Sequence, residues 1–131
     1  AAVPKMPFLK DLIDALPLTN YCTTIPLPLL NGESAATRIG IVAPVEFTHA
    51  IHADFSQMRM CAAPQTVKVI FDLRPPETTS LYPVIDLARE FMQTHRLTPV
   101  CEGYTRQYAW FVDPDGQMRH YSELIVPVMA P

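Results

Sequence analysis

The chain has 131 residues, of which 49% are apolar and 18% are charged, and its formal net charge is −3. This length fits one domain, and the apolar fraction is large enough to build a core. The negative charge and the scattered basic residues argue against a DNA-binding surface, because neutralising phosphates requires clustered Lys and Arg. No apolar run reaches the roughly 18 residues of a membrane span, and no segment resembles a signal peptide.

The first third of the chain predicts a helix followed by a hairpin. Apolar residues recur at helical spacing over residues 7–16, and Pro7 suits a first-turn position. Residues 21–30 and 38–45 have the composition of extended segments, the second being rich in Ile and Val. Asn31-Gly32 between them is a strong turn signal, so we expect a hairpin with a loose loop.

The middle of the chain predicts a connector, two strands and a helix. Residues 46–57 have no clear period and are expected to form a connector, followed by a strand at 58–63. Residues 66–73 alternate apolar and polar side chains, as in a half-buried strand. Residues 79–96 give the clearest helix, capped by Ser80. Its expected apolar face consists of Leu81, Val84, Ile85, Leu87, Ala88, Phe91 and Met92.

The last third predicts a second hairpin. Residues 100–112 and 119–128 are expected to be strands, joined at Asp113-Pro114-Asp115-Gly116, where Pro presets φ and Gly accepts positive φ. Helix and hairpin thus occur twice in the same order. We therefore expect an α+β domain that contains two copies of one unit.

The three cysteines, Cys22, Cys61 and Cys101, are far apart in the sequence and form no CxxC motif. An odd number without such a motif is typical of reduced, buried thiols in a cytoplasmic protein. His49 and His52 lie near Asp54 and Cys61, and the four could ligate zinc, but they lack the paired spacing of zinc ligands. We therefore expect neither a metal nor a cofactor.

The pattern resembles the GyrI-like effector-binding family, in particular the drug-sensing domain of MerR-type bacterial multidrug regulators. The resemblance covers roughly residues 8–128. The segments that carry it are Met58–Pro64, Val67–Phe71, Leu87–His95, Leu97–Tyr104 and Glu123–Val128, with a looser match at Phe8–Ala15, Asn20-Tyr21 and Arg38–Val45.

The resemblance implies duplicated β-α-β-β units with pseudo-twofold symmetry, an antiparallel sheet and two main helices around an apolar, aromatic-lined ligand cleft. It implies that residues 1–131 form one ligand-binding domain of a longer cytoplasmic transcription regulator. DNA would be bound by a separate domain of that regulator, which we expect to be a dimer. The ligand would be a small hydrophobic or aromatic molecule, and no membrane partner is expected.

In drug-sensing relatives a tyrosine is followed by a pocket glutamate that pairs with a cationic drug. The corresponding residues here are Tyr104 and Thr105, so the carboxylate is absent from that position. A buried carboxylate attracts a cation strongly in a medium of low dielectric constant, so its loss weakens the case for a cationic ligand. Glu102 and Glu123 are the nearest substitutes in the sequence.

Strand alternation over residues 103–110 predicts two different faces. Tyr104, Tyr108 and Trp110 would share one face, which is either core or a stacking wall for a flat ligand, while Thr105 and Gln107 would share the other. Arg106 on the aromatic face is either solvated or an anion-selecting group. The complete set of expected ligand-binding residues is Tyr21, Phe71, Glu102, Tyr104, Thr105, Gln107, Tyr108, Trp110, His120, Tyr121 and Glu123.

Two other functions stay open at this point. Some GyrI-like proteins resemble hydrolases that use a pocket glutamate, so Glu102 or Glu123 could act as a general acid or base once buried. No Ser-His-Asp spacing, GxSxG motif, P-loop or GxGxxG motif occurs, and we expect a binding domain rather than an enzyme. The third reading is an interaction module whose centre is filled by its own side chains.

Overall fold

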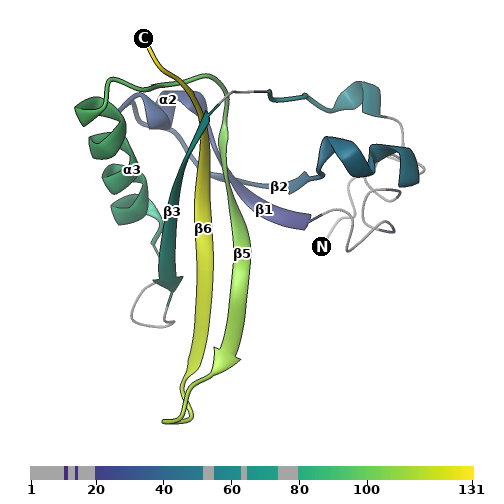
Figure 1. The fold of residues 1–131 in the computed structure, drawn as a ribbon, viewed down its shortest axis with the longest axis vertical. Helices are drawn as coiled ribbons and strands as arrows, with labels where there is room; N and C mark the ends of the chain where they lie inside the picture. Colours follow the sequence, from purple (N-terminus) through teal and green to yellow (C-terminus); the bar gives the residue numbers. More distant parts are fainter. Residues whose placement is uncertain (1–10, 12–13, 15–19, 52–54, 63–64, 74–79) are drawn as a thin grey trace. The chain divides into compact units, whose positions relative to one another are not determined.

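The computed structural model describes residues 11, 14, 20–51, 55–62, 65–73 and 80–131 (Figure 1). The chain divides into two compact units, one of residues 1–21 and 40–60 and the other of residues 22–39 and 61–131. The helix expected at residues 7–16 lies outside the described residues apart from Asp11 and Asp14, which are both helical.

The described strands form one antiparallel sheet in the order β2-β1-β5-β6-β3, with β4 also paired to β6. The sheet and the helices confirm the expected α+β class. The strands are β1 (Asn20–Ile25), β2 (Arg38–Val42), β3 (Gln65–Leu73), β4 (Thr98–Pro99), β5 (Gly103–Val112) and β6 (Met118–Met129). No described helix has the length and hydropathy needed to cross a membrane.

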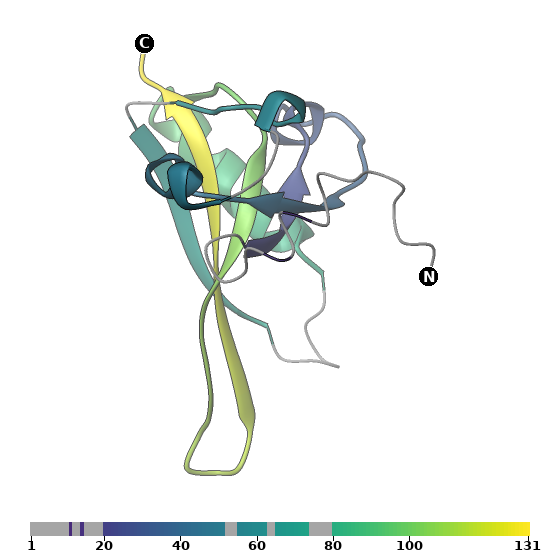
Figure 2. The same ribbon diagram turned by 90° about the vertical axis from the view of Figure 1, so that its right-hand side faces the viewer.

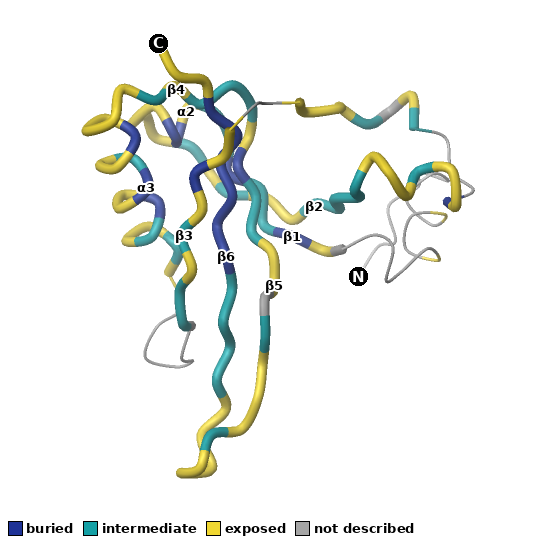
Figure 3. Tube along the Cα trace, viewed as in Figure 1, coloured by how far each residue is buried: buried dark blue, intermediate teal, exposed yellow. Residues whose placement is uncertain are grey.

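Strand β6 is the centre of the second unit and pairs with every residue of β3, from Gln65 opposite Val128 to Leu73 opposite His120 (Figure 1). Every residue from Glu123 to Val128 is buried (Figure 3). Directly paired residues of neighbouring strands point to the same side of a sheet. Leu124, Val126 and Val128 therefore share one side with Val67, which we call the helix side because α3 packs against it.

Helix α3 (Tyr82–Thr94) is shorter than the expected 79–96, and Leu81 rather than Ser80 is its N-cap, although the Tyr82 N–H donates a hydrogen bond of 3.3 Å to the Ser80 hydroxyl. Ile85, Ala88 and Met92 are buried in the core. The expected apolar face was too wide, because Leu87 and Phe91 are 55% and 48% exposed. A helix that packs against one sheet buries only a narrow stripe of side chains. Leu87 and Phe91 lie about 100° or more around the helix axis from the centre of that stripe.

Residues 21–30 do not form one extended segment, as the sequence had predicted. Strand β1 ends at Ile25 and a short helix follows, α2 (Leu27–Leu30). Proline is compatible with the first turn of a helix, where its missing N–H has no partner to lose, so Pro28 does not prevent the turn. The helical turn buries Leu29 and Leu30 in the core, and this burial explains why the segment is helical and not extended.

The segment between β2 and β3 contains two 3₁₀ helices, η1 (Val45–Ala50) and η2 (Phe55–Gln57), where a connector was expected. The strand expected at residues 58–63 is wrong for its described residues, 58–62, which have no strand structure. Met60 is 73% exposed, so the apolar composition of this segment does not reflect burial.

Cys61 and Cys101 form a disulfide, and this overturns the expectation of reduced thiols. Cys61 is exposed and Cys101 is half-buried, whereas Cys22 is buried and lies outside the bond. The two bonded cysteines precede β3 and β5, which flank β6 on its two sides. Sequence spacing did not reveal the bond, because 40 residues separate partners that only the sheet order brings together.

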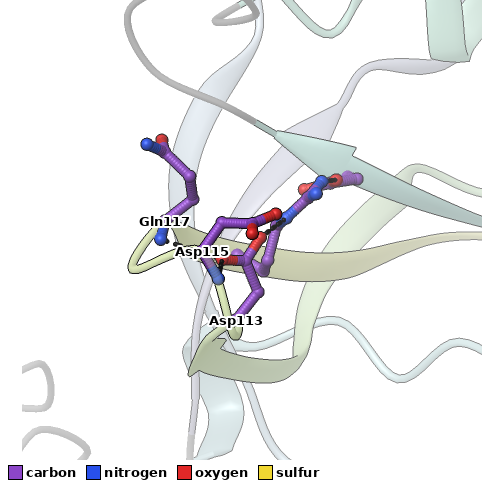
Figure 4. Close-up of polar contacts among 5 residues, drawn as sticks. Asp113, Asp115 and Gln117 are labelled. Atoms are coloured by element: carbon purple, nitrogen blue, oxygen red, sulfur yellow. Dashed lines mark hydrogen bonds and ion pairs between the residues drawn. The ribbon is translucent and has the colours of Figure 1, made fainter.

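Strands β5 and β6 form a long hairpin whose turn matches the prediction (Figure 2). The Asp113 carboxylate accepts hydrogen bonds of 2.9 Å from the backbone N–H groups of Asp115 and Gln117 (Figure 4). Gly116 has φ +77°, a conformation that glycine adopts without steric strain. The hairpin ladder is regular except for one β-bulge, between Gln107 and Ala109.

Candidate functional site

The bulge changes which residues of β5 share a face. Tyr104 pairs with Ile125, but beyond the bulge Trp110 pairs with His120. Since β6 continues without interruption beside β3, Ile125 and His120 point to opposite sides of the sheet. The prediction that Tyr104 and Trp110 share a face is therefore wrong, because an extra residue in one strand inverts the alternation.

The expected aromatic wall is replaced by two cross-strand pairs on opposite sides. Trp110 stacks on His120 on the helix side, with ring centroids 6.3 Å apart. Phe111 stacks on Tyr121 on the other side, which we call the open side only because α3 does not pack against it, with centroids 5.8 Å apart. Trp110 is 62% exposed and Phe111 is 46% exposed, so neither ring belongs to the core.

Three polar side chains gather on the open side, above the buried half of β6. Arg106 pairs directly with Glu123, and Tyr104 is two residues before Arg106 on the same face of β5. We refer to these three residues as the Tyr104–Arg106–Glu123 cluster. Sequence reasoning had selected Tyr104 and Glu123 for one site, and the strand register brings them together.

Glu123 is the unusual member of the cluster, because its side chain belongs to the central strand and only 6% of the residue is exposed. Arg106, across the ladder, is exposed. Within the described part of the chain, no hydrogen bond or ion pair holds the Glu123 carboxylate. Its oxygens are not among the buried unpaired polar atoms of the described residues, so a group from outside can reach the carboxylate.

Burial and nearby charges shift the pKa of the Tyr104 hydroxyl. Burial raises its pKa above the ordinary value of 10.0, and the negative charges of Glu123 and Cys22 raise the pKa further, while Arg106 lowers it. The phenol is therefore protonated at neutral pH and can donate a hydrogen bond. Its half-buried ring adds an apolar surface beside the carboxylate.

Thr105 has a role in the fold that the sequence did not predict. Its hydroxyl accepts a hydrogen bond of 3.0 Å from the Thr23 backbone N–H and so fastens β1 to β5. The β1–β5 ladder itself is short, with Thr24 opposite Tyr104 and Ile25 opposite Gly103. Thr105 lies on the helix side, on the face opposite Tyr104 that the alternation predicts, and its role in ligand binding stays a prediction.

The other expected site residues are spread over the molecule. Phe71 packs against the core on the helix side, and Gln107 is exposed on that same side beyond Thr105. Glu102 is exposed and precedes β5. Tyr21 is 54% exposed and belongs to the first unit, and the side chain of Tyr108 lies outside the described atoms.

An ionic network at the far end of the open side was missed entirely. Arg119 donates hydrogen bonds of 2.9 Å to Asp113 and 3.0 Å to Asp72, and all three side chains are less than a quarter exposed (Figure 4). The network ties the end of β3 to the hairpin turn. The turn signal at Asp113 was visible in the sequence, but the pairing with Asp72 depends on the register of β3 and β6.

The residues considered for zinc give no metal site among those described. Cys61 is in the disulfide, while His52 and Asp54 lie outside the described residues.

Comparisons of the chain with protein-family models, with curated proteins and with solved structures found no match. The resemblance to the GyrI-like family therefore rests on the sequence pattern alone.

Proposed function

We propose that this chain is the effector-binding domain of a bacterial transcription regulator, and that a small aromatic or hydrophobic molecule binds over the Tyr104–Arg106–Glu123 cluster. One observation carries the proposal, namely the buried Glu123 carboxylate beside the Tyr104 phenol on a face that is not covered by α3. Small-molecule sites typically combine an apolar surface with a few convergent polar groups, and the cluster offers both.

Glu123 supplies a carboxylate in place of the glutamate that follows the tyrosine in drug-sensing members of the GyrI-like family. The position after the tyrosine is Thr105, but Glu123 on the neighbouring strand points to the face of Tyr104. A carboxylate can thus stand beside the tyrosine although it comes from another strand. This arrangement supports the family resemblance without depending on residue-by-residue identity.

An aromatic cation is the ligand class that the cluster favours. Such a ligand can place its charge on Glu123, where burial strengthens the attraction, and its ring on the face of Tyr104. Arg106 is exposed and can turn toward solvent when the cation approaches. We propose that the charge of the Glu123 carboxylate gives the preference for a cation over a neutral or anionic aromatic molecule.

The test is a calorimetric titration with three probes of similar size: a lipophilic aromatic cation, its neutral isostere and a lipophilic aromatic anion. We expect saturable binding of the cation and a loss of at least tenfold in affinity in Glu123→Gln. Glu102→Gln is the matched control, because it removes an exposed carboxylate just before β5, the strand that pairs with β6. Equal binding by both variants, or no binding of any probe, would contradict the proposal.

We propose binding without turnover. Hydrolysis at Glu123 is the competing function, since a buried carboxylate can serve as a general base. The two are separated by incubating the wild-type chain with each bound probe and analysing the probe by mass spectrometry. Recovery of unchanged probe supports a sensor, whereas product that requires Glu123 makes the chain an enzyme.

The remaining parts of the proposal concern the longer protein. We propose that the chain contains the duplicated β-α-β-β units and the pseudo-twofold symmetry of the family. A separate domain would bind DNA, and the full-length regulator would be a dimer. The ligand would shift this dimer between two states only through unequal affinity for them.

We propose a cytoplasmic location for the regulator, and the redox state of Cys61 and Cys101 in the cell tests it. Disulfides persist in oxidising compartments and are rare in the cytoplasm, where they are usually transient. The exposed Cys61 would then be open to reduction. Alkylation of free thiols during cell lysis tests this location. Alkylated Cys61 and Cys101 would support a cytoplasmic location, whereas an intact disulfide in all molecules would contradict it.

A further inference from the structure

The two cysteines of the disulfide differ in their access to solvent. Cys61 is exposed, whereas Cys101 is half-buried between β4 and β5. In thiol–disulfide exchange a thiolate must reach one of the two sulfur atoms, so access decides which of them is attacked. Exposed disulfides are also the ones that exchange readily and take regulatory roles. The Cys61 side of the bond is therefore where a thiol from solution can react.

The segment that carries Cys61 has few other attachments. Residues 58–62 form neither helix nor strand, and residues 59–62 are all exposed. Among the described residues, the backbone of 59–62 makes no hydrogen bond to the sheet, and the Met58 N–H donates to the Phe55 carbonyl oxygen within the segment before it. The disulfide is therefore what holds these residues beside Cys101, which is 40 residues further along the chain.

Cys101 is held in place without the disulfide. Strand β4, which precedes it, pairs with the end of β6, and β5 begins soon after it, at Gly103. Between the two strands the Val100 N–H donates a hydrogen bond of 3.0 Å to the Pro127 carbonyl oxygen. Cleavage of the disulfide should therefore release residues 58–62 and leave Cys101 near its position on the sheet.

The place of the bond in the chain gives this release a consequence. The chain passes between its two compact units three times, at residues 21–22, 39–40 and 60–61. The first two passages lie within strands β1 and β2, whereas the third lies in the segment without regular structure, directly before Cys61. The disulfide fastens this third passage to the second unit, so its redox state determines whether the passage is fixed or free.

We propose that Cys61 is a site of modification by small-molecule thiols, and that this modification switches residues 58–62 from a fixed to a released state. The thiolate of the small molecule attacks the Cys61 sulfur and forms a new S–S bond there. The Cys101 sulfur leaves with the electron pair of the broken bond, as a thiolate. A second small-molecule thiol then attacks the first and frees Cys61. The two small molecules end as their own disulfide, and they supply the two electrons and two protons of the protein thiols.

Glutathione, a tripeptide thiol, tests the site of attack. The oxidised chain is incubated with glutathione, its free thiols are blocked by alkylation, and the mixture is digested with trypsin. Cleavage after Arg59 and Arg96 puts the two cysteines on separate peptides. Mass spectrometry should find the mixed disulfide on Cys61 about tenfold more often than on Cys101. Glutathione mainly on Cys101, or on neither cysteine, would overturn the proposal.

Limited trypsin digestion of the folded chain tests the release. Arg59 is exposed and lies two residues before Cys61, so the rate of cleavage after it reports on this segment. Reduction with a dithiol should raise that rate about tenfold, because a released segment enters the protease more readily. The double variant C61S/C101S should be cleaved after Arg59 at the rate of the reduced wild type, with or without the reductant.

Cleavage after Arg96 is the internal control. This site is held by a hydrogen bond of 2.8 Å from the Leu97 N–H to the Met92 carbonyl oxygen, and reduction should leave its rate unchanged. Faster cleavage after Arg59 alone would support a local switch. An unchanged rate after Arg59 would overturn the proposal, and so would equal acceleration after Arg96, because reduction would then unfold the whole unit.

Discussion

The indole of Trp110 stacks on the imidazole of His120 at an interplanar angle of 15°, on the side of the sheet opposite Tyr104. The single bulge between Gln107 and Ala109 produces this inversion. A ligand that lies on the Tyr104–Arg106–Glu123 cluster therefore cannot touch Trp110 from the same side. Tryptophan fluorescence is accordingly a poor reporter for the proposed site, although Trp110 is the only tryptophan of the chain.

Ultraviolet titration of tyrosinate absorbance tests the environment of Tyr104. The difference between wild type and Tyr104→Phe isolates this residue, and its pKa should lie above 10.0 because of burial and the charge of Glu123. Glu123→Gln should lower the pKa only in part, since burial is the larger cause. A pKa at or below 10.0 in the wild-type chain would mean that the phenol is neither buried nor near a negative charge.

The same shift predicts how stability depends on pH. The folded pKa of Tyr104 is raised, so the folded state holds this proton more tightly than the unfolded state does. The resulting stabilisation is complete below pH 10.0 and is lost as the pH rises through the folded pKa. Urea unfolding between pH 9 and 11 should show a smaller decline in Tyr104→Phe. Parallel declines in the two proteins would contradict this assignment.

Arg119→Ala should lower the free energy of unfolding by about 2–4 kcal/mol, because it leaves the sheltered carboxylates of Asp72 and Asp113 without their shared cation. Asp86→Ala is the control, since the Asp86 side chain is 70% exposed and its pair with Arg89 should contribute less than about 0.5 kcal/mol. Urea denaturation measures both. Equal effects would show that the network at the turn adds nothing beyond a surface ion pair.

Reduction of the Cys61–Cys101 disulfide should destabilise the second unit by about 4 kcal/mol, from the chain entropy of a loop of 40 residues. Urea unfolding with and without a dithiol reductant measures the loss. The double variant C61S/C101S serves as the control, because the reductant should not destabilise it further. An unchanged wild-type midpoint under reducing conditions, with thiol labelling to confirm cleavage, would show that the bond contributes little.

Helix α3 offers a matched pair of large-to-small substitutions. Ile85→Ala should cost about 3 kcal/mol of unfolding free energy, since Ile85 is 1% exposed in the core. Leu87→Ala should cost less than about 1 kcal/mol, because Leu87 is largely exposed. Thermal or urea unfolding distinguishes the two, and a larger loss in Leu87→Ala would mean that the helix packs through another face.

Local patterns in the sequence predicted much of the second unit. The alternation of residues 66–73, the helical period after Ser80 and the Asp-Pro-Asp-Gly turn each correspond to an element of the structure. These signals are local, because they depend on the period of burial and on turn chemistry. The short helix at Leu27–Leu30 was not predictable in this way, since tertiary burial of Leu29 and Leu30 decides it.

The site was harder to predict than the elements, because it depends on register. Glu123 and Tyr104 could be chosen as residue types, but their common face follows from the pairing of β5 with β6. A bulge that inserts one residue cannot be read from period-2 alternation, and it moved Trp110 to the other side. The disulfide and the Asp72–Arg119 pair likewise join residues far apart in the sequence.

The most direct test of the central claim is a two-dimensional NMR titration of the labelled chain with the aromatic cation. Binding over the cluster should shift the backbone amide signals of Tyr104, Arg106 and Glu123 in a saturable way. The signals of Leu87 and Trp110, which lie away from the cluster, should change little. Saturable shifts confined to residues around Trp110 and His120, or no shifts at all, would contradict the account.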